Sequence, residues 1–207
     1  MKFHAILPKT IGLHLGAGKH PMPGWFNTDL NEDQALGIVA LDAAKPFPFA
    51  DGSFPFVFSE HMIEHVPYES GSLMIRECFR VLRPGGRIRI ATPDFRFLVD
   101  LYLGSSRGIR ERYVRWATEK FIPSADSFDP IFVVNNFVRN WGHKFIYDEE
   151  LLSGLMESSG FTDVCRWKVG ESPTPALRTL ENVNRMPSGF LELESMVLEA
   201  QKPLTEA

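Results

Sequence analysis

The sequence predicts an α/β protein whose mostly parallel, Rossmann-like sheet carries helices on both faces. Four short segments are apolar enough for buried strands: 11–15, 25–28, 37–41 and 53–59. Residues 68–82 then place apolar side chains at helical spacing, and 87–91 alternates apolar and basic side chains as a strand does. Strands and helices that alternate in this way are typical of open α/β sheets, which bind ligands at the carboxyl ends of their strands.

Length and composition fit one globular domain. The chain has 207 residues, of which 44% are hydrophobic and 23% charged, and its net charge is −4. An acidic chain lacks the uncompensated basic surface that sequence-independent binding to nucleic acid requires. We therefore expect a single domain over residues 1–207 and no sequence-independent nucleic-acid binding.

Two features bear on the cellular compartment. Cys78 and Cys165 lie in an expected helix and an expected strand, which does not indicate a disulfide framework. The apolar residues after Lys2 stop at Pro8, which is too short for a signal peptide, and no apolar run is long enough to span a membrane. These features predict a cytoplasmic protein with no membrane partner.

The segment from Ile11 to Leu30 indicates the kind of ligand. An apolar strand leads into Gly16-Ala17-Gly18, and the next strand ends on Asp29, whose carboxylate can accept hydrogen bonds from both hydroxyls of a ribose. A dinucleotide site requires a third glycine that opens a helix, with its acid about 20 residues on. Pro21 stands in place of that glycine, and without a helix a pyrophosphate lacks its main anchor. S-adenosylmethionine (SAM), which has ribose and no phosphate, fits better.

The chain then continues the alternation. The strand at 37–41 also ends on an acid, Asp42, and Pro84-Gly85-Gly86 is expected to stop the helix at 68–82. Another helix is expected from about 94 to 103. These segments complete the pattern of a parallel sheet.

Residues 104–141 interrupt this alternation of strands and helices. A helix is expected at 107–120, followed by a loop that contains Pro123, Pro130 and several aromatic side chains. One interpretation is an additional helix with a small core of its own. The other interpretation is a lid that binds the acceptor, because such loops lie over the edge of the sheet where ligands bind.

The C-terminal part is expected to close the sheet. Asp148 is placed to cap a helix that Gly160 ends. Segments 162–169 and 194–200 are expected to be a closing pair of strands. The proline-rich loop at 172–189 is long enough to cap a site.

Together these blocks resemble a known family. LHLGAG, NTDL, LDAAKPFPFADGSFPFVFSEHMIEHV and ECFRVLRPGGRIRIATPD occur in the order and at about the distances found in class I SAM-dependent methyltransferases, particularly the short bacterial methyltransferase-domain type. GHKFIYDEELLSGLMESSGF is similar to a later segment of that family. The likeness covers about residues 11–169. It implies a seven-stranded sheet in the order 3-2-1-4-5-7-6, with the last strand antiparallel.

The resemblance implies SAM as cofactor, S-adenosylhomocysteine (SAH) as product, and a set of binding residues. These are Gly16, Ala17, Gly18, Asp29, Leu30, Asp42, Ala43, Ser59 and Glu60. In the family's pattern the glycines border the methionine part and Asp29 holds the ribose hydroxyls. Asp42 accepts from the adenine amino group, and Ser59 and Glu60 face the sulfonium and amino end.

Two departures from the family stand out. Pro55 replaces the last acid of the usual D-G-S-F-D, which affects the local loop and the start of the strand. The first helix is missing, so Lys19, His20 or the 104–141 insertion would have to enclose the amino-acid end of SAM.

The stretch from Ser59 to His65 carries most of the reactive side chains. If it turns helical, His61, Glu64 and His65 share one face and can serve as base for an acceptor that must lose a proton. The spacing H-x-x-E-H also matches a zinc-protease signature. We expect no metal, because the motif follows a strand rather than lying in a long helix and no second motif supplies a third ligand. His143 is a weaker candidate on the acceptor side.

The resulting hypothesis is a SAM-dependent methyltransferase that acts on a small or medium-sized acceptor, with a sugar or polysaccharide precursor as the candidate. The sugar rests on association with the family, since no residue identifies the acceptor. A non-catalytic SAM- or nucleoside-binding regulator is the main alternative. An NAD-dependent oxidoreductase, a zinc hydrolase and a protein-interaction module that keeps only the fold are further alternatives. The sequence does not indicate an oligomeric state.

Overall fold

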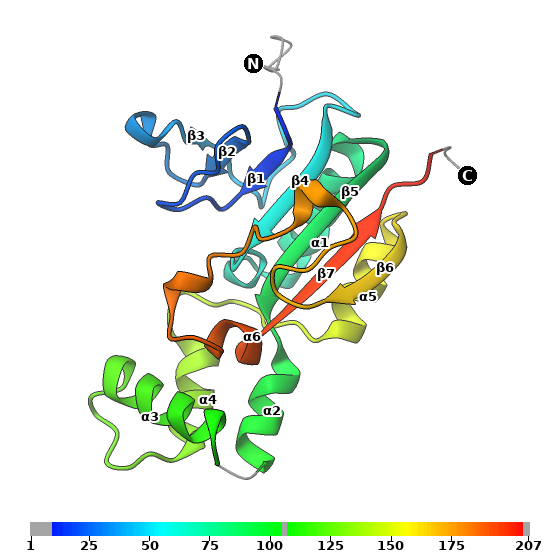
Figure 1. The fold of residues 1–207 in the computed structure, drawn as a ribbon. Coiled ribbons are helices and arrows are strands. Elements are labelled where there is room, and N and C mark those ends of the chain that lie inside the picture. The colour runs from blue at the N-terminus through cyan, green and yellow to red at the C-terminus, as the bar shows by residue number, and fades with distance from the viewer. Residues whose placement is uncertain (1–9, 105–106, 205–207) are drawn as a thin grey trace.

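Seven strands form one sheet in the order β3-β2-β1-β4-β5-β7-β6, as expected. The computed structural model describes residues 10–104 and 107–204 (Figure 1). The strands are β1 (Leu13–Leu15), β2 (Phe26–Asp29), β3 (Val39–Ala40), β4 (Phe54–Glu60), β5 (Leu82–Pro93), β6 (Thr162–Trp167) and β7 (Ser195–Gln201). The pairs among β1 to β5 are parallel, whereas β7 is antiparallel to both β5 and β6. The Rossmann-like class and the strand order are therefore confirmed.

One face of the sheet packs against α1 (Tyr68–Val81) and α5 (Glu149–Ser158). Their apolar stripes join the alternating residues of the strands in one buried cluster, in which Met74 and Met156 are fully buried. The Asp148 side chain caps α5 by accepting from the Leu151 amide at 2.9 Å, and Gly160 follows the helix at φ +102°. This face is the main hydrophobic core.

The other face is covered by residues 168–189, which we call the strap. The strap contains two short 3₁₀ turns, η3 (Pro175–Leu177) and η4 (Val183–Arg185). Leu177 packs there in a small buried cluster with Trp25 and Phe58. Irregular chain therefore covers this face, whereas regular helices cover the other, so the expected helices on both faces are found on one face only.

Residues 95–104 and 107–141 form a small helical unit with a core of its own. Figure 1 shows α2 (Phe95–Leu103), α3 (Ile109–Phe121) and α4 (Pro130–Arg139) gathered beyond the end of β5. Their facing side chains make a second buried cluster around Tyr113 and Phe137. Helix α4 lies where a loop was expected. Pro130 occupies its first turn, and the Asp129 side chain accepts from the Ile131 amide at 2.9 Å, so the proline begins a helix here.

Several boundaries differ from expectation. Helix α1 ends at Val81, and Pro84-Gly85-Gly86 lies inside β5 instead of ending the helix. Strand β3 has only two residues, and the short helix α6 (Phe190–Glu194) precedes β7. Pro55 lies in β4 at a shift in register, where a residue without an amide hydrogen is tolerated. Among the described residues, no helix is long and apolar enough to cross a membrane.

Candidate functional site

A cavity of about 590 Å³ opens at the carboxyl ends of the first strands. All the residues expected to bind the cofactor line it, except Ser59. The glycine turn follows β1, Asp29 ends β2, Asp42 follows β3 and Glu60 ends β4. Because parallel strands end at the same edge of the sheet, residues far apart in the sequence meet here. We call this the first cavity.

The glycine turn is shaped by close packing on one side and open space on the other. Gly16 has φ +73°, and a Cβ there would lie 2.5 Å from Cγ of Met62. Gly18 has φ +53°, and no heavy atom lies within 4 Å of the position of a Cβ. Positive φ and tight packing require glycine at position 16, while Gly18 leaves its backbone open to a ligand.

Two carboxylates lie beside this turn. Asp29 Oδ2 accepts from the Gly18 amide at 2.9 Å, so Asp29 holds the turn and still has free lone pairs for a ligand. Asp42 accepts from the Ala44 amide at 3.0 Å and pairs with Lys45 at 3.0 Å. The hydrogen bond from Lys45 and that from the Ala44 amide lower the pKa of Asp42. Asp42 is therefore a hydrogen-bond acceptor at neutral pH, and both carboxylates line the first cavity.

An irregular segment between β1 and β2 takes the place of the missing helix. Asn27 holds it by accepting from the Met22 amide at 2.8 Å and donating to the Met22 carbonyl at 3.0 Å. His14 Nδ1 lies 2.9 Å from the same Asn27 side chain, and burial lowers the pKa of His14. His20 and Met22 line the first cavity, whereas Lys19 is absent from its lining. One of the residues expected to enclose the ligand is therefore in place.

Ser59 and Glu60 point to different sides of β4. Ser59 is fully buried and does not line the cavity, which corrects its expected place beside the cofactor. The reason is the alternation of side chains along a strand, which turns Glu60 to the cavity and Ser59 away from it. Burial raises the pKa of Glu60. Its carboxylate accepts from the Asn182 amide at 3.1 Å and lies 3.7 Å from Arg185.

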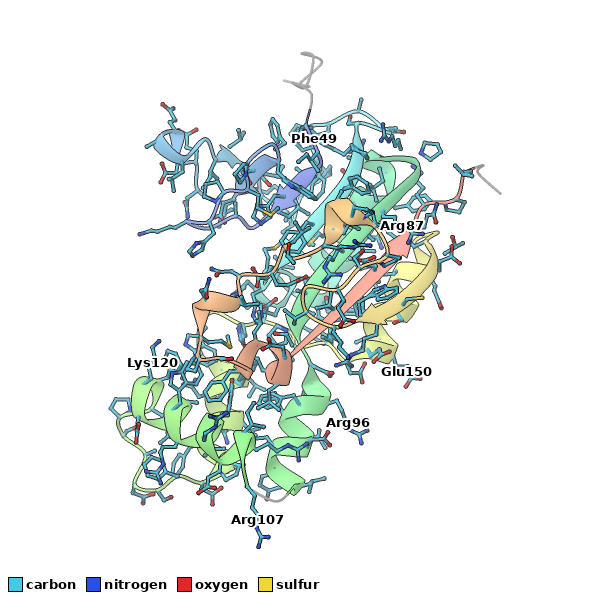
Figure 2. All side chains as sticks on the ribbon, in the orientation of Figure 1. Phe49, Arg87, Arg96, Arg107, Lys120 and Glu150 are labelled. Carbon is cyan, nitrogen blue, oxygen red and sulfur yellow. The ribbon has the colours of Figure 1, made fainter. Side chains whose placement is uncertain are left out.

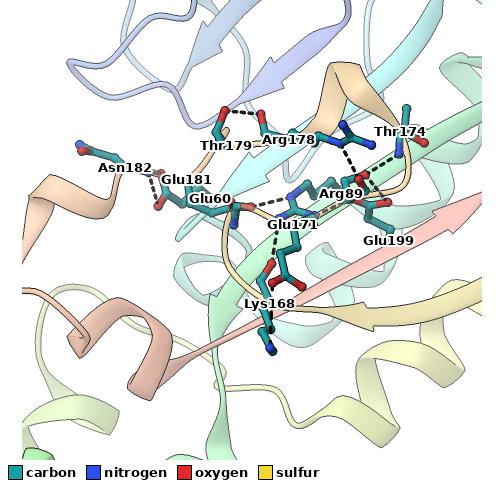
Figure 3. Close-up of polar contacts among 12 residues, drawn as sticks. Glu60, Arg89, Lys168, Glu171, Thr174, Arg178, Thr179, Glu181, Asn182 and Glu199 are labelled. Carbon is teal, nitrogen blue, oxygen red and sulfur yellow. Dashed lines mark hydrogen bonds and ion pairs between the residues drawn. The ribbon is translucent and has the colours of Figure 1, made fainter.

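A buried arginine fixes the strap over this edge of the sheet. Arg89 is fully buried and makes ion pairs of 2.5 Å with both Glu181 and Glu199. It also donates to the Glu171 carbonyl at 2.8 Å, as Figure 3 shows. These bonds, together with the contact of Glu60 with Asn182, hold Leu180, Asn182 and Arg185 in the wall of the first cavity.

A second cavity, of about 290 Å³, adjoins the first. His61, His65 and Arg185 line both cavities. The remaining walls come mainly from the helical unit and include the aromatic residues Tyr113, Trp116, Phe121, Phe137 and Trp141. Lys120 also lines it and lies at the end of α3 nearest the strap, whereas Arg107 at the other end points away (Figure 2).

The three candidate catalytic residues meet in the wall between the cavities. Glu64 and His65 belong to the 3₁₀ turn η2 (Ile63–His65), and His61 precedes it at φ +47°. His61 Nδ1 lies 3.3 Å and His65 Nε2 3.9 Å from Glu64 Oε1. Burial tends to raise the pKa of Glu64, but the two histidines outweigh it and the pKa is lowered. Glu64 lines only the second cavity.

Several residues that line the second cavity were not singled out from the sequence. Among them, Arg185, Met186 and Glu194 come from the strap and α6. Glu194 is buried, which raises the pKa of its carboxyl, and it accepts a hydrogen bond from the Tyr113 hydroxyl. No local motif marks these residues, because they reach the site only through long-range packing.

Comparison with known proteins indicates which class of protein this chain resembles. A family model described as a methyltransferase domain matches residues 20–90. No curated protein matches the chain. A SAM-dependent methyltransferase from Thermotoga maritima, described as a possible histamine N-methyltransferase, has a similar structure, with 16% identity over 95% of this chain and 84% of that one and a TM-score of 0.53. A SAM-dependent methyltransferase from Archaeoglobus fulgidus also has a similar structure, with 16% identity over 92% of this chain and 85% of that one and a TM-score of 0.52.

The same fold also occurs with another activity. The cyclase SpnF has 15% identity over 95% of this chain and 78% of its own, with a TM-score of 0.50. Similarity at this level establishes the fold alone. The strand order defines a Rossmann-like fold, and a cavity opens at the ends of its strands. With the matched methyltransferase domain, they support a class I SAM-dependent methyltransferase.

Proposed function

We propose that the protein binds SAM in the first cavity and transfers its methyl group to an acceptor in the second. The observation that carries this proposal is the shared wall, in which His61, His65 and Arg185 face both cavities. A methyl donor and its acceptor must approach each other closely while the rest of each molecule stays apart. Two cavities that meet at one wall meet this requirement.

The first cavity suits a nucleoside better than a dinucleotide. Among the described residues, Arg185 is the only lysine or arginine in its lining, and it lies close to the Glu60 carboxylate. The segment after the glycine turn is irregular and presents no helix N-terminus to a pyrophosphate. Asp29 and Asp42 supply acceptors for ribose hydroxyls and an adenine amino group. This favours SAM over NAD.

Catalysis would rest mainly on positioning. SAM supplies a methyl group that its sulfonium already activates. Holding two reactants in line can lower a barrier by about 7–11 kcal/mol, and the fixed wall between the cavities provides such a frame. His61 is placed to take the proton of a hydroxyl acceptor, with Glu64 and His65 beside it. The positive φ of His61 is a strained conformation of the kind found at functional sites.

The second cavity favours a small or medium-sized acceptor with a flat or apolar face. Its aromatic walls provide contact area, and Lys120 lies 5.5 Å from the ring of Trp116. A sugar unit of a polysaccharide precursor is one acceptor of this size. Arg107, which precedes α3, and Arg112 and Arg115 on α3 are exposed and do not line the cavity, so they give no reason to expect an anionic acceptor.

Calorimetric titration with SAM and SAH tests the cofactor directly. We expect micromolar binding to the wild-type protein and a loss of about 10- to 100-fold in Asp29→Ala, because charge-assisted hydrogen bonds contribute about 1.5–3 kcal/mol. Asp29→Asn keeps the shape and serves as the second variant. Absence of binding to both ligands would refute the proposed function.

Turnover separates an enzyme from a SAM-binding regulator. SAH release would be measured with a panel of sugars, amines and phenols. We expect His61→Ala to lose turnover and keep its affinity for SAM. Unchanged turnover would remove His61 from the mechanism, and SAM affinity without turnover on any acceptor would favour the regulator.

A further inference from the structure

Glu64, His65 and His143 converge on the second cavity. One possible ligand atom from each side chain lies within 4.8 Å of the others, and all three residues line the cavity. The rings of His65 and His143 are 5.0 Å apart. Two imidazoles and a carboxylate around an open space form a donor set that binds divalent metals.

Backbone hydrogen bonds bring the third residue to the other two. The amides of Lys144 and Phe145 both donate to the carbonyl oxygen of Glu64, at 2.7 and 3.2 Å. His143 therefore lies next to η2 although it is remote in sequence. The expectation of no metal rested on the position of the motif after a strand and on the missing third ligand, and folding provides a candidate for that ligand.

The Glu64 carboxylate has one oxygen that lacks a hydrogen-bond donor. Oε2 accepts from the Thr92 hydroxyl at 3.0 Å. Oε1 has no hydrogen-bond partner although Glu64 is fully buried, because His61 Nδ1 at 3.3 Å lies outside hydrogen-bonding geometry. A buried carboxylate oxygen without a hydrogen bond costs free energy, and such oxygens nearly always have a hydrogen-bond partner. A bound cation would supply that partner.

The hydrogen bond of His143 leaves its other nitrogen free for a ligand. His143 Nδ1 lies 2.6 Å from the Phe137 carbonyl oxygen, which can only accept, so Nδ1 carries the proton. A neutral ring then has a bare lone pair on Nε2. Histidines that bind metals commonly donate their second nitrogen to a backbone carbonyl in this way.

We propose that Glu64, His65 and His143 bind one divalent first-row cation of the zinc or manganese type in the wall of the second cavity. His61 is outside this ligand set, because only the ligand atoms of Glu64, His65 and His143 lie mutually within 4.8 Å among the described residues. Three protein ligands leave coordination positions open toward the cavity, as in catalytic metal sites. His65 Nε2 lies 3.9 Å from Glu64 Oε1, and its half-exposed ring is free to make the small shift that places both atoms at bonding distance from one cation.

The role of this cation rests on the proposed function. It would hold the oxygen of a hydroxyl acceptor and ease loss of its proton, which passes to His61 and then to solvent. The oxygen electron pair then forms the bond to the methyl carbon while the carbon–sulfur bond breaks. The bonding pair remains on sulfur, so the products are the methyl ether, SAH and a proton.

Metal binding can be measured without SAM or an acceptor. Protein stripped with a chelator would be titrated calorimetrically with zinc and with manganese, and its visible spectrum recorded with cobalt. We expect one site and a cobalt spectrum of a low-coordinate complex. His143→Ala and His65→Ala should each weaken binding about 100-fold, since loss of even a supporting residue costs about 10- to 100-fold. His20→Ala, in the first cavity, should leave metal affinity unchanged.

Two outcomes would overturn the site: no stoichiometric uptake of any of the three metals, or uptake that His143→Ala and His65→Ala leave unaltered. Circular dichroism of both variants checks that they fold, and the exposure of His65 makes its variant the safer one. The same metal-free protein would be titrated with SAM. SAM binding without metal uptake rejects only the metal site, and metal uptake without SAM binding rejects only the proposed function.

Discussion

The two cavities are built in different ways. The first is formed mainly by turns that directly follow or end β1, β2, β3 and β4, with the strap as one wall, and the glycine turn is held by a near neighbour in sequence, Asp29. The second is formed mainly by α3, α4, the strap and α6, which meet through side-chain packing and the hydrogen bond from Tyr113 to Glu194. The fold itself produces the first cavity, whereas insertions added to the fold produce the second.

This difference bears on specificity. Strand ends can be kept while the insertions change, so one cofactor site can serve many acceptors. Arg185 and the strap join the two cavities, since the strap lines the first and contributes to the second. Variants in the strap should therefore affect both cavities, and variants elsewhere should affect one.

Arg89→Met should have the largest effect. The substitution leaves the buried carboxylates of Glu181 and Glu199 unpaired, and breaking a buried ion pair costs about 3–5 kcal/mol of unfolding free energy. It also releases the strap, so SAM affinity should fall as well. Urea unfolding and calorimetric titration would measure the two effects.

A neutral triple variant is the control for Arg89→Met. Combining it with Glu181→Gln and Glu199→Gln removes the unpaired charges and should recover most of the lost unfolding free energy. An unfolding free energy of Arg89→Met within about 1 kcal/mol of wild type would show that the ion pairs do not hold the strap.

The contrast between the cavities also explains what could be predicted from the sequence. Asp29 and Asp42 could be placed because each ends or follows an apolar strand, and parallel strands end at one edge. Ser59 was expected beside the cofactor, but side chains alternate along β4, so Glu60 faces the first cavity and Ser59 points away from it. Arg185 and Glu194 carry no local signal. Helix α4 was missed because Pro130 was taken as a break, although the aspartate before it is a cap.

Asp42→Asn tests the first cavity alone. The substitution removes the charge of the oxygen that would accept from an adenine amino group. SAM affinity should therefore fall about tenfold, which is the lower end of what a hydrogen bond to a charged group contributes. Acceptor specificity should not change. Calorimetric titration measures the affinity, with Glu32→Gln, an exposed residue outside the cavity lining, as the control. Equal affinities in all three proteins would show that Asp42 does not contact the ligand.

Trp141→Ala tests the second cavity alone. Trp141 is 41% exposed and packs edge-on against Phe121 and Phe137, so its loss should leave the fold intact. We expect KM for the acceptor to rise about three- to tenfold, because one aromatic contact contributes about 0.5–1.5 kcal/mol beyond its buried area. SAM affinity should stay constant. Phe128→Ala, an exposed aromatic residue outside the cavity lining, is the matched control, and a change in SAM affinity alone would contradict the division of roles.

Glu77→Gln should have the smallest effect, and that effect should depend on pH. Arg80 donates to the Glu77 carboxylate at 2.6 and 2.8 Å, and the Phe47 amide donates to it at 2.5 Å, which fixes the loop after Asp42. The hydrogen bonds from Arg80 and from the Phe47 amide lower the pKa of Glu77 despite its burial. A lowered pKa in the folded state means that the carboxylate stabilises the fold above the ordinary value of 4.5 and loses this contribution as pH falls through the folded value. The variant should therefore be less stable by about 1 kcal/mol at neutral pH, and the difference should shrink in acid. Urea unfolding at neutral pH and in acid measures this difference in unfolding free energy, with the exposed Glu157→Gln as control. A difference that persists unchanged in acid would show that packing, rather than the charge, accounts for the loss.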